Sequence, residues 1–148
     1  MLKHYYKIPI DINELFAKKK AKPKLYVSLL QSINQHLELL FHTAFHELRY
    51  DHDYGSKISS LDYTTEKQSG MFERAIEASL LESIERYEHR LKNPHVSIRY
   101  NRGGKILTGN DQSSFRVYIM IHVSATFKEL EEVYDNTFRI FFSPLAAT

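Results

Sequence analysis

The chain has 148 residues, of which 43% are hydrophobic and 26% charged, and its formal net charge is +2. This length and composition predict a soluble domain with a hydrophobic core, and so small a charge gives no support to nucleic-acid binding. Without cysteine, the chain has no disulfides and no thiolate metal sites. Its first residues lack the apolar run of a signal peptide and no stretch is long enough to span a membrane, so we expect a cytoplasmic protein without membrane contacts.

Residues 1–23 are predicted to form an N-terminal arm, followed by one domain at residues 24–148. Aromatic and apolar residues at positions 5–10 suit a short strand, which Pro9 confines to the edge of a sheet. Five lysines then oppose the dipole of the helix that follows. These lysines are Lys18, Lys19, Lys20, Lys22 and Lys24. They suit either a solvated linker or a contact with an acidic partner surface or with nucleic-acid phosphate.

A first helix is predicted near residues 24–42, because apolar residues keep helical spacing there and Pro23 suits a first turn. The residues with this spacing are Leu25 (or Tyr26), Leu29, Ile33, Leu37, Leu40 and Phe41. Residues 42–64 have no sustained period, which predicts a long loop. Loops of this length in a compact domain usually serve a function.

This loop begins with His42 and His46, four residues apart, so a metal site has to be weighed. In zinc peptidases a glutamate directly follows the first histidine of such a pair, whereas Thr43 stands there in this chain. A histidine near the C-terminal end of a helix is also favourable on electrostatic grounds alone. We therefore predict no metal site and no cofactor.

A second helix is predicted near residues 66–91, where the longest helical pattern of the chain is ended by Asn93 and Pro94. Helical spacing places Arg90 on the apolar face and Glu88 at its margin. Such an arginine either has a specific acceptor, or only passes along the apolar face and caps the last carbonyls of the helix. The apolar face itself consists of Phe72, Ile76, Leu80, Ile84, Tyr87 and Leu91.

Beyond Pro94 a period of two predicts strands near residues 95–102, 114–125 and 137–143, with an acidic loop or helical turn within residues 127–136. The predicted fold class is α+β, with two helices packed on one face of a small antiparallel sheet of three to four strands. The last strand would carry unpaired backbone groups that can accept or donate a strand. The alternative is an ordinary edge protected by Pro144.

Short motifs follow one another in a defined order along roughly residues 28–125. The first motif is a leucine-rich helix end with a threonine, which consists of Leu37, Leu40 and Thr43. A loop follows that contains a glutamate, Glu47, and an aromatic–glycine pair, Tyr54 and Gly55. A charged segment with Glu88 and Arg90 then precedes a strand. This order resembles the baseplate wedge family of contractile injection machines, which includes the phage gene-twenty-five-like lysozyme proteins and TssE of type VI secretion. His89 stands where that family has proline.

The resemblance implies a structural role, because proteins of this family bind other wedge subunits and offer the contractile sheath a template for assembly. It implies wedge subunits and sheath proteins as partners, and no small-molecule substrate. If the charged pair is a docking site, as we expect, both of its side chains should be accessible in the free protein; in a structural site they would bond within the fold. The residues expected to make partner contacts are Glu88, Arg90, Glu47, Tyr54, Gly55, Phe138, Ile140 and Phe142.

The lysozyme label of this family raises the alternative of a peptidoglycan-cleaving hydrolase. Glycosidases need two carboxylates across a cleft, one of them with a raised pKa. The loop aspartates lie among histidines and Glu88 lies two residues from Arg90, which favours ionised carboxylates. The carboxylates that a hydrolase could use are Glu47, Asp51, Asp53, Glu73 and Glu88. We nevertheless expect that the protein is not an enzyme and has no catalytic residues. A nucleic-acid binder that uses the lysine-rich arm is a more distant third reading.

Overall fold

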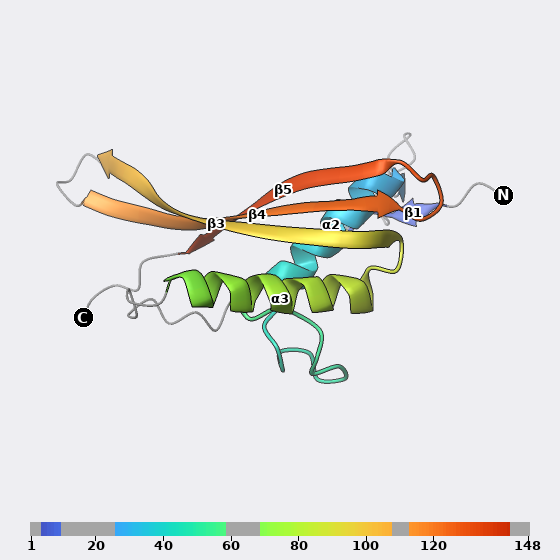
Figure 1. The fold of residues 1–148 in the computed structure, drawn as a ribbon, viewed down its shortest axis with the longest axis horizontal. Helices are drawn as coiled ribbons and strands as arrows, with labels where there is room; N and C mark the ends of the chain where they lie inside the picture. Colours follow the sequence, from blue (N-terminus) through green and yellow to red (C-terminus); the bar gives the residue numbers. More distant parts are fainter. Residues whose placement is uncertain (1–3, 10–25, 59–68, 108–112, 143–148) are drawn as a thin grey trace, which may run out of the picture.

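The computed structural model describes residues 4–9, 26–58, 69–107 and 113–142 (Figure 1). Two helices and two antiparallel sheets make up this part of the chain, which confirms the predicted α+β class. No helix among these residues is long and apolar enough to cross a membrane. In chain order the elements are β1 (Tyr5–Tyr6), β2 (Tyr26–Val27), α2 (Leu29–His42), α3 (Ser69–Tyr87), β3 (Leu91–Leu107), β4 (Ser113–Phe127) and β5 (Val133–Phe142).

The main sheet has β4 in its centre, with β3 on one side and β5 on the other, all antiparallel. β5 ends opposite Val117, whereas β3 and β4 continue to pair as far as Leu107 and Ser113. The far end of the sheet is therefore a two-stranded hairpin. The three predicted strands are confirmed, and each begins before its predicted start.

Both helices lie on one face of the main sheet, with α3 against β3 and α2 against β5 (Figure 1). Alternate side chains of each strand point toward the helices, because the side-chain period of a strand is two. The residues buried between the helices and the sheet are mainly aliphatic: Ile33, Leu37, Leu40, Phe41, Ile76, Leu80, Ile84, Ile98, Ile119, Ile121, Val123 and Ile140. Removing this apolar surface from water holds the helices in place.

The first helix begins at Leu29, so the predicted start at residue 24 is wrong. Ser28 caps it: its hydroxyl accepts the N–H of Gln31, and the Gln31 side chain accepts the N–H of Ser28, which completes a capping box. Tyr26 and Val27 instead form β2, which pairs with β1. The five lysines between these two strands, like the predicted end of the arm at residue 23, lie in residues 10–25, outside the described residues.

The second helix ends at Tyr87, so the predicted end at residue 91 is wrong. The N–H of Glu88 still donates to the Ile84 carbonyl at 2.8 Å, but the N–H of Leu91 donates to the Glu88 carbonyl at 3.2 Å. That second bond closes a turn and directs the chain into β3. The Glu88 carboxylate supports the turn by accepting the N–H of Arg90 at 3.2 Å, which a residue inside a continuous helix would donate to a backbone carbonyl.

The acidic connection between β4 and β5 is a short loop that contains one helical turn, in which the N–H of Glu131 donates to the Phe127 carbonyl at 2.9 Å. The N–H of Phe127 donates to the carbonyl of Glu132 at 2.8 Å, and Glu131 between them has a φ of 53°. The N–H of Lys128 donates to the Arg90 carbonyl, also at 2.8 Å. The β4–β5 loop is thereby attached to the turn between α3 and β3, where the candidate site lies.

Candidate functional site

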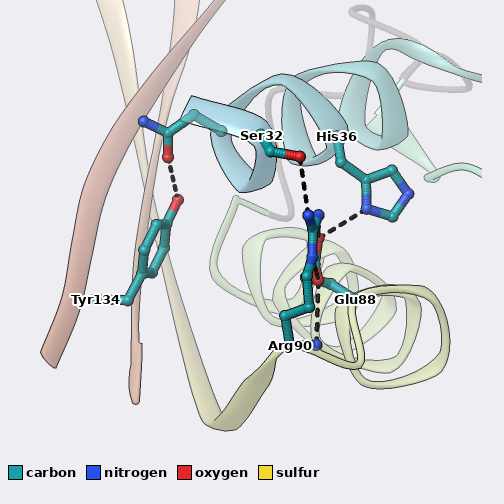
Figure 2. A network of polar contacts seen from close by, with 6 residues as sticks. Ser32, His36, Glu88, Arg90 and Tyr134 are labelled. Carbon is teal, nitrogen blue, oxygen red and sulfur yellow. Dashed lines mark hydrogen bonds and ion pairs between the residues drawn. The ribbon is translucent and has the colours of Figure 1, made fainter. Parts of the chain in front are cut away.

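Glu88 is the one charged residue among the described residues that is fully buried, at 2% exposed. Its carboxylate faces the guanidinium group of Arg90 (Figure 2). Arg90 Nε donates to Oε1 of Glu88 at 2.6 Å, and Nη2 donates to Oε2. Two parallel bonds of this kind join the planar groups in a fixed orientation. Arg90 therefore has a specific acceptor, which is one of the two alternatives that its position in the sequence left open.

Helix α2 supplies the other partners of this pair, from residues one helical turn apart. Arg90 Nη1 donates to the hydroxyl of Ser32 at 2.9 Å, and Nδ1 of His36 lies 2.8 Å from Oε2 of Glu88 (Figure 2). The N–H of Arg90 adds a bond to Oε1 of the same carboxylate. We call Ser32, His36, Glu88 and Arg90 the network; it joins α2 to the turn between α3 and β3.

The network decides the ionisation of its carboxyl group. Burial alone raises the pKa of Glu88, but the hydrogen bonds and the positive charge of Arg90 and His36 outweigh burial and lower the pKa to about 2. Glu88 is therefore a carboxylate at neutral pH. A buried charge of this kind is tolerable because its hydrogen-bonding capacity is satisfied.

The structure corrects one expectation about this pair. Docking was expected to leave both side chains accessible, but only 1% of the Glu88 side chain is exposed, against 27% for Arg90. The physical reason lies in the helix end: because α3 stops at Tyr87, the following turn directs the carboxylate toward α2 instead of along the helix margin. The accessible side chains at this site are therefore those of Arg90 and His36, at 27% and 21% exposed, and not that of Glu88.

The loop after α2 is held against the same helix end. Tyr54 packs edge-to-face on Tyr87, with ring centroids 5.0 Å apart. Gly55 has a φ of +128°, and a Cβ there would lie 2.5 Å from the Thr43 carbonyl oxygen, so only glycine fits. Glu47 is exposed, and its carboxylate accepts the N–H of Ala44 at 2.7 Å. In the free protein these three predicted contact residues stabilise the loop.

Comparison with known families adds a second line of evidence. The profile of the family described as baseplate wedge protein gp25 matches residues 27–127, from β2 to the end of β4. The chain belongs to the gp25 baseplate wedge family. The match includes both helices, the loop between them and the Glu88–Arg90 pair.

A solved structure with the same fold is described as a candidate tail lysozyme of Geobacter sulfurreducens. It superposes with a TM-score of 0.53 and 14% sequence identity, over 81% of this chain and 96% of that chain. At this identity the likeness concerns the fold alone. Comparison with curated proteins gives no match.

In this gp25-family protein two of the three predicted contact residues of β5, Phe138 and Ile140, face the core. Phe138 packs edge-to-face on Phe41, with ring centroids 5.1 Å apart, and Ile140 is 5% exposed. Phe142 ends β5 opposite Val117, and its side chain lies outside the described residues. What β5 offers to a partner is therefore its backbone edge and its outer face, not the side chains of Phe138 and Ile140.

A further bond fixes β5 to the helix that carries the network. The Tyr134 side chain is fully buried, and its hydroxyl donates to Oδ1 of Asn34 on α2 at 2.8 Å (Figure 2). Asn34 lies between Ser32 and His36 in the sequence. One helix thus holds both the sheet edge and the Glu88–Arg90 pair.

Sequence reasoning did not single out Ser32 or His36. The only signal was their spacing of four on α2, which places two polar groups on one side of a helix. Nothing in the chain links that pair with a carboxylate 52 residues away from His36 or with an arginine 58 residues away from Ser32. Contacts this distant in sequence require the structure.

His42, which ends α2, and the loop histidines His46 and His52 are placed apart from the network. Nδ1 of His42 bonds the Glu38 carbonyl at 2.8 Å, and the rings of His46 and His52 lie 5.5 Å apart at a cavity of about 170 Å³ beside α3. Within the described ranges, no three histidine, aspartate or glutamate side chains are grouped so that they could hold a metal ion. The cavity is also lined by Phe45, Asp53, Glu82, Ser83, Arg86 and Tyr87.

Proposed function

We propose that this gp25-family protein is a structural subunit of a contractile injection machine, either a phage-like tail or a type VI secretion system, assembled in the cytoplasm. In this role it binds other wedge subunits and gives sheath proteins a strand edge on which assembly starts. The observation that carries the proposal is the position of β5 at the edge of the main sheet, where, within the described residues, it pairs with β4 alone.

The edge of β5 suits strand addition for two physical reasons. It is long, since ten residue pairs join β5 to β4, whereas proteins commonly keep unused edges short to avoid unwanted pairing. It is also fixed in position, because Tyr134, Phe138 and Ile140 anchor it on the helix side. A fixed edge can pair with an added strand without first paying the entropy of ordering its own backbone.

The network gives little support to a hydrolase, because a hydrolase needs a carboxyl group that can donate a proton. A glycosidase acid needs a raised pKa, whereas Arg90 and His36 overcome the effect of burial and hold the pKa of Glu88 at about 2. Asp51 accepts the Tyr87 hydroxyl at 2.9 Å, and Asp53 pairs with Arg86 at 2.9 Å. These contacts engage both loop aspartates within the fold, which supports a protein without catalytic activity.

The test is amide hydrogen exchange of the purified protein, alone and with the sheath protein of the same host. Strand addition should protect the amides of residues 133–142 that point away from β4. The amides of α2 and α3 in the same sample serve as the internal control and should keep their rates. Unchanged exchange along β5 would contradict the sheath template, and failure to bind either sheath or wedge subunits would contradict the structural role as a whole.

A parallel measurement decides between the scaffold and the hydrolase. The purified protein is added to a peptidoglycan suspension, whose turbidity should remain constant. Clearing of the suspension by the wild type would refute the non-catalytic role and favour the hydrolase instead.

A further inference from the structure

The face of the main sheet that points away from the helices separates its charges between its two ends. Ile98, Ile119 and Ile140 are buried toward the helices. Their sequence neighbours on β3, β4 and β5 therefore point to the opposite side, because successive side chains of a strand alternate. We call this side the outer face; both helices lie on the other side of the sheet (Figure 1).

One end of the outer face is basic and aromatic. The register places Arg99 of β3 opposite Met120 of β4, and Met120 opposite Arg139 of β5. In the next row the rings of Tyr118 and Phe141 lie 5.7 Å apart, and Phe141 is 55% exposed. Both arginines are exposed, and among the described residues no carboxylate forms an ion pair with either of them. We call these five residues the basic–aromatic patch.

The other end of the outer face is formed by residues 128–133, the acidic loop, through which β4 leads into β5. It contains three glutamates and one lysine, and so has a net charge of −2. The side chains of Glu131 and Glu132 are exposed, as are those of Leu130 and Val133, at 56% and 77%. Lys92 lies at the same end of the outer face, but on β3, two strands away from β5.

The two ends of the outer face can meet only between molecules. Val133 and Phe141 lie eight residues apart on one strand, which is about 27 Å, so the acidic loop cannot contact the patch of its own sheet. Thr137 lies midway between them. A two-fold axis that crosses the strands at Thr137 would place the acidic loop of each molecule over the patch of the other. Sheets that pack face to face lie about 10 Å apart, a distance that an arginine and a glutamate side chain bridge together.

We propose that the outer face is a self-association surface, on which a second copy of this chain packs with its strands reversed. Charge complementarity selects this occupant, because the carboxylates of Glu131 and Glu132 then face the guanidinium groups of Arg99 and Arg139. The apolar side chains of the acidic loop lie against Phe141 in the same arrangement. Two copies with parallel strands would instead place arginine on arginine and repel each other.

The size of the outer face implies a transient dimer. Three strands cover a width of about 15 Å over a length of about 27 Å, or roughly 400 Å² on each molecule. This area is at the low end of the range for specific protein contacts. The dimer leaves the backbone edge of β5 uncovered. The inference concerns the free protein and does not rest on the proposed function.

The experiment is sedimentation velocity of the full chain over a series of concentrations, at about 0.05 M and about 0.5 M salt. The wild type should form a reversible dimer at low salt and dissociate at high salt, where charges are screened over shorter distances. Two double variants reverse the charges of one end each: Arg99→Glu with Arg139→Glu, and Glu131→Lys with Glu132→Lys. Each alone should raise the dissociation constant more than about tenfold, because like charges then face each other.

An equimolar mixture of the two double variants supplies the decisive measurement. In a heterodimer of the variants every acidic end faces a basic one, so the mixture should dimerise about as tightly as the wild type. This recovery also shows that both variants are folded. Arg49→Glu with Arg74→Glu makes the same change in net charge at exposed positions elsewhere, and should dimerise like the wild type.

Three results would overturn the inference. The first is a wild type that remains monomeric at every concentration at low salt, which would leave the outer face to an acidic surface of another protein. The second is dimerisation of either double variant as tight as that of the wild type, which would place the contact on another face. The third is a mixture of the double variants that fails to associate, since the proposed contact requires that it does.

Discussion

Glu88→Gln should destabilise the protein by an amount that depends on pH. The substitution keeps the shape of the side chain but removes the charge that pairs with Arg90. The pKa of Glu88 is lowered from 4.5 to about 2 in the folded protein, and each unit corresponds to about 1.4 kcal/mol. The ionised carboxylate therefore stabilises the wild type by about 3 kcal/mol at pH 7. Because the folded pKa is depressed, this stability is fully present above pH 4.5 and is lost as the pH falls toward 2.

The assay is urea unfolding of the wild type and the variant at pH 7 and at pH 3. The difference in free energy of unfolding should fall from about 3 kcal/mol at pH 7 to about 1 kcal/mol at pH 3. Other groups titrate in both proteins, so their contributions largely cancel in the difference. Glu85→Gln, at an exposed position on α3, should change stability by less than about 0.5 kcal/mol at either pH. An equal loss for Glu88→Gln at both pH values would refute the reasoning that the charged pair stabilises the fold.

Three further predictions concern the loop, the first helix and the absence of lytic activity. Gly55→Ala should lower stability by about 1–3 kcal/mol in urea unfolding, because its φ of +128° and the nearby Thr43 carbonyl exclude a Cβ; a smaller loss would show that the loop relaxes easily. Ser28→Ala removes the cap on Gln31 and should cost about 1 kcal/mol in the same assay. Glu47→Gln and the wild type should be equally inert toward peptidoglycan, and a turbidity loss that only the wild type causes would assign Glu47 a catalytic role.

The sequence predicted the elements of this fold well, because periodicity reports directly on burial. The period-two pattern of residues 114–125 became the central strand, and apolar spacing located both helices. Their ends were less predictable. Asn93 and Pro94 were read as the stop signal of a helix, but the helix had already ended at Tyr87, and the two residues lie at a bulge in β3, with Asn93 at a φ of 48°. A proline is compatible with either position.

The candidate site was predictable in its charged pair and not in its environment. The spacing of Glu88 and Arg90, with the family pattern, was sufficient to select them. Whether they faced solvent depended on the direction of the turn after α3 and on Ser32 and His36, which reach the pair from another helix. The contact of Arg90 with the Tyr5 ring was equally unpredictable, since a cation–π contact between residues 5 and 90 has no local signature.

The ten residue pairs that join β5 to β4 also have a mechanical meaning. A partner strand on the outer edge of β5, as proposed above, can transmit a load along the strand axis or across the sheet. Antiparallel hydrogen bonds run perpendicular to the strand axis, so a pull along that axis loads all of them at once in shear, whereas a pull across the sheet would open them one by one. The long pairing therefore makes β5 a strong attachment for tension along the strand and a weak one for peeling.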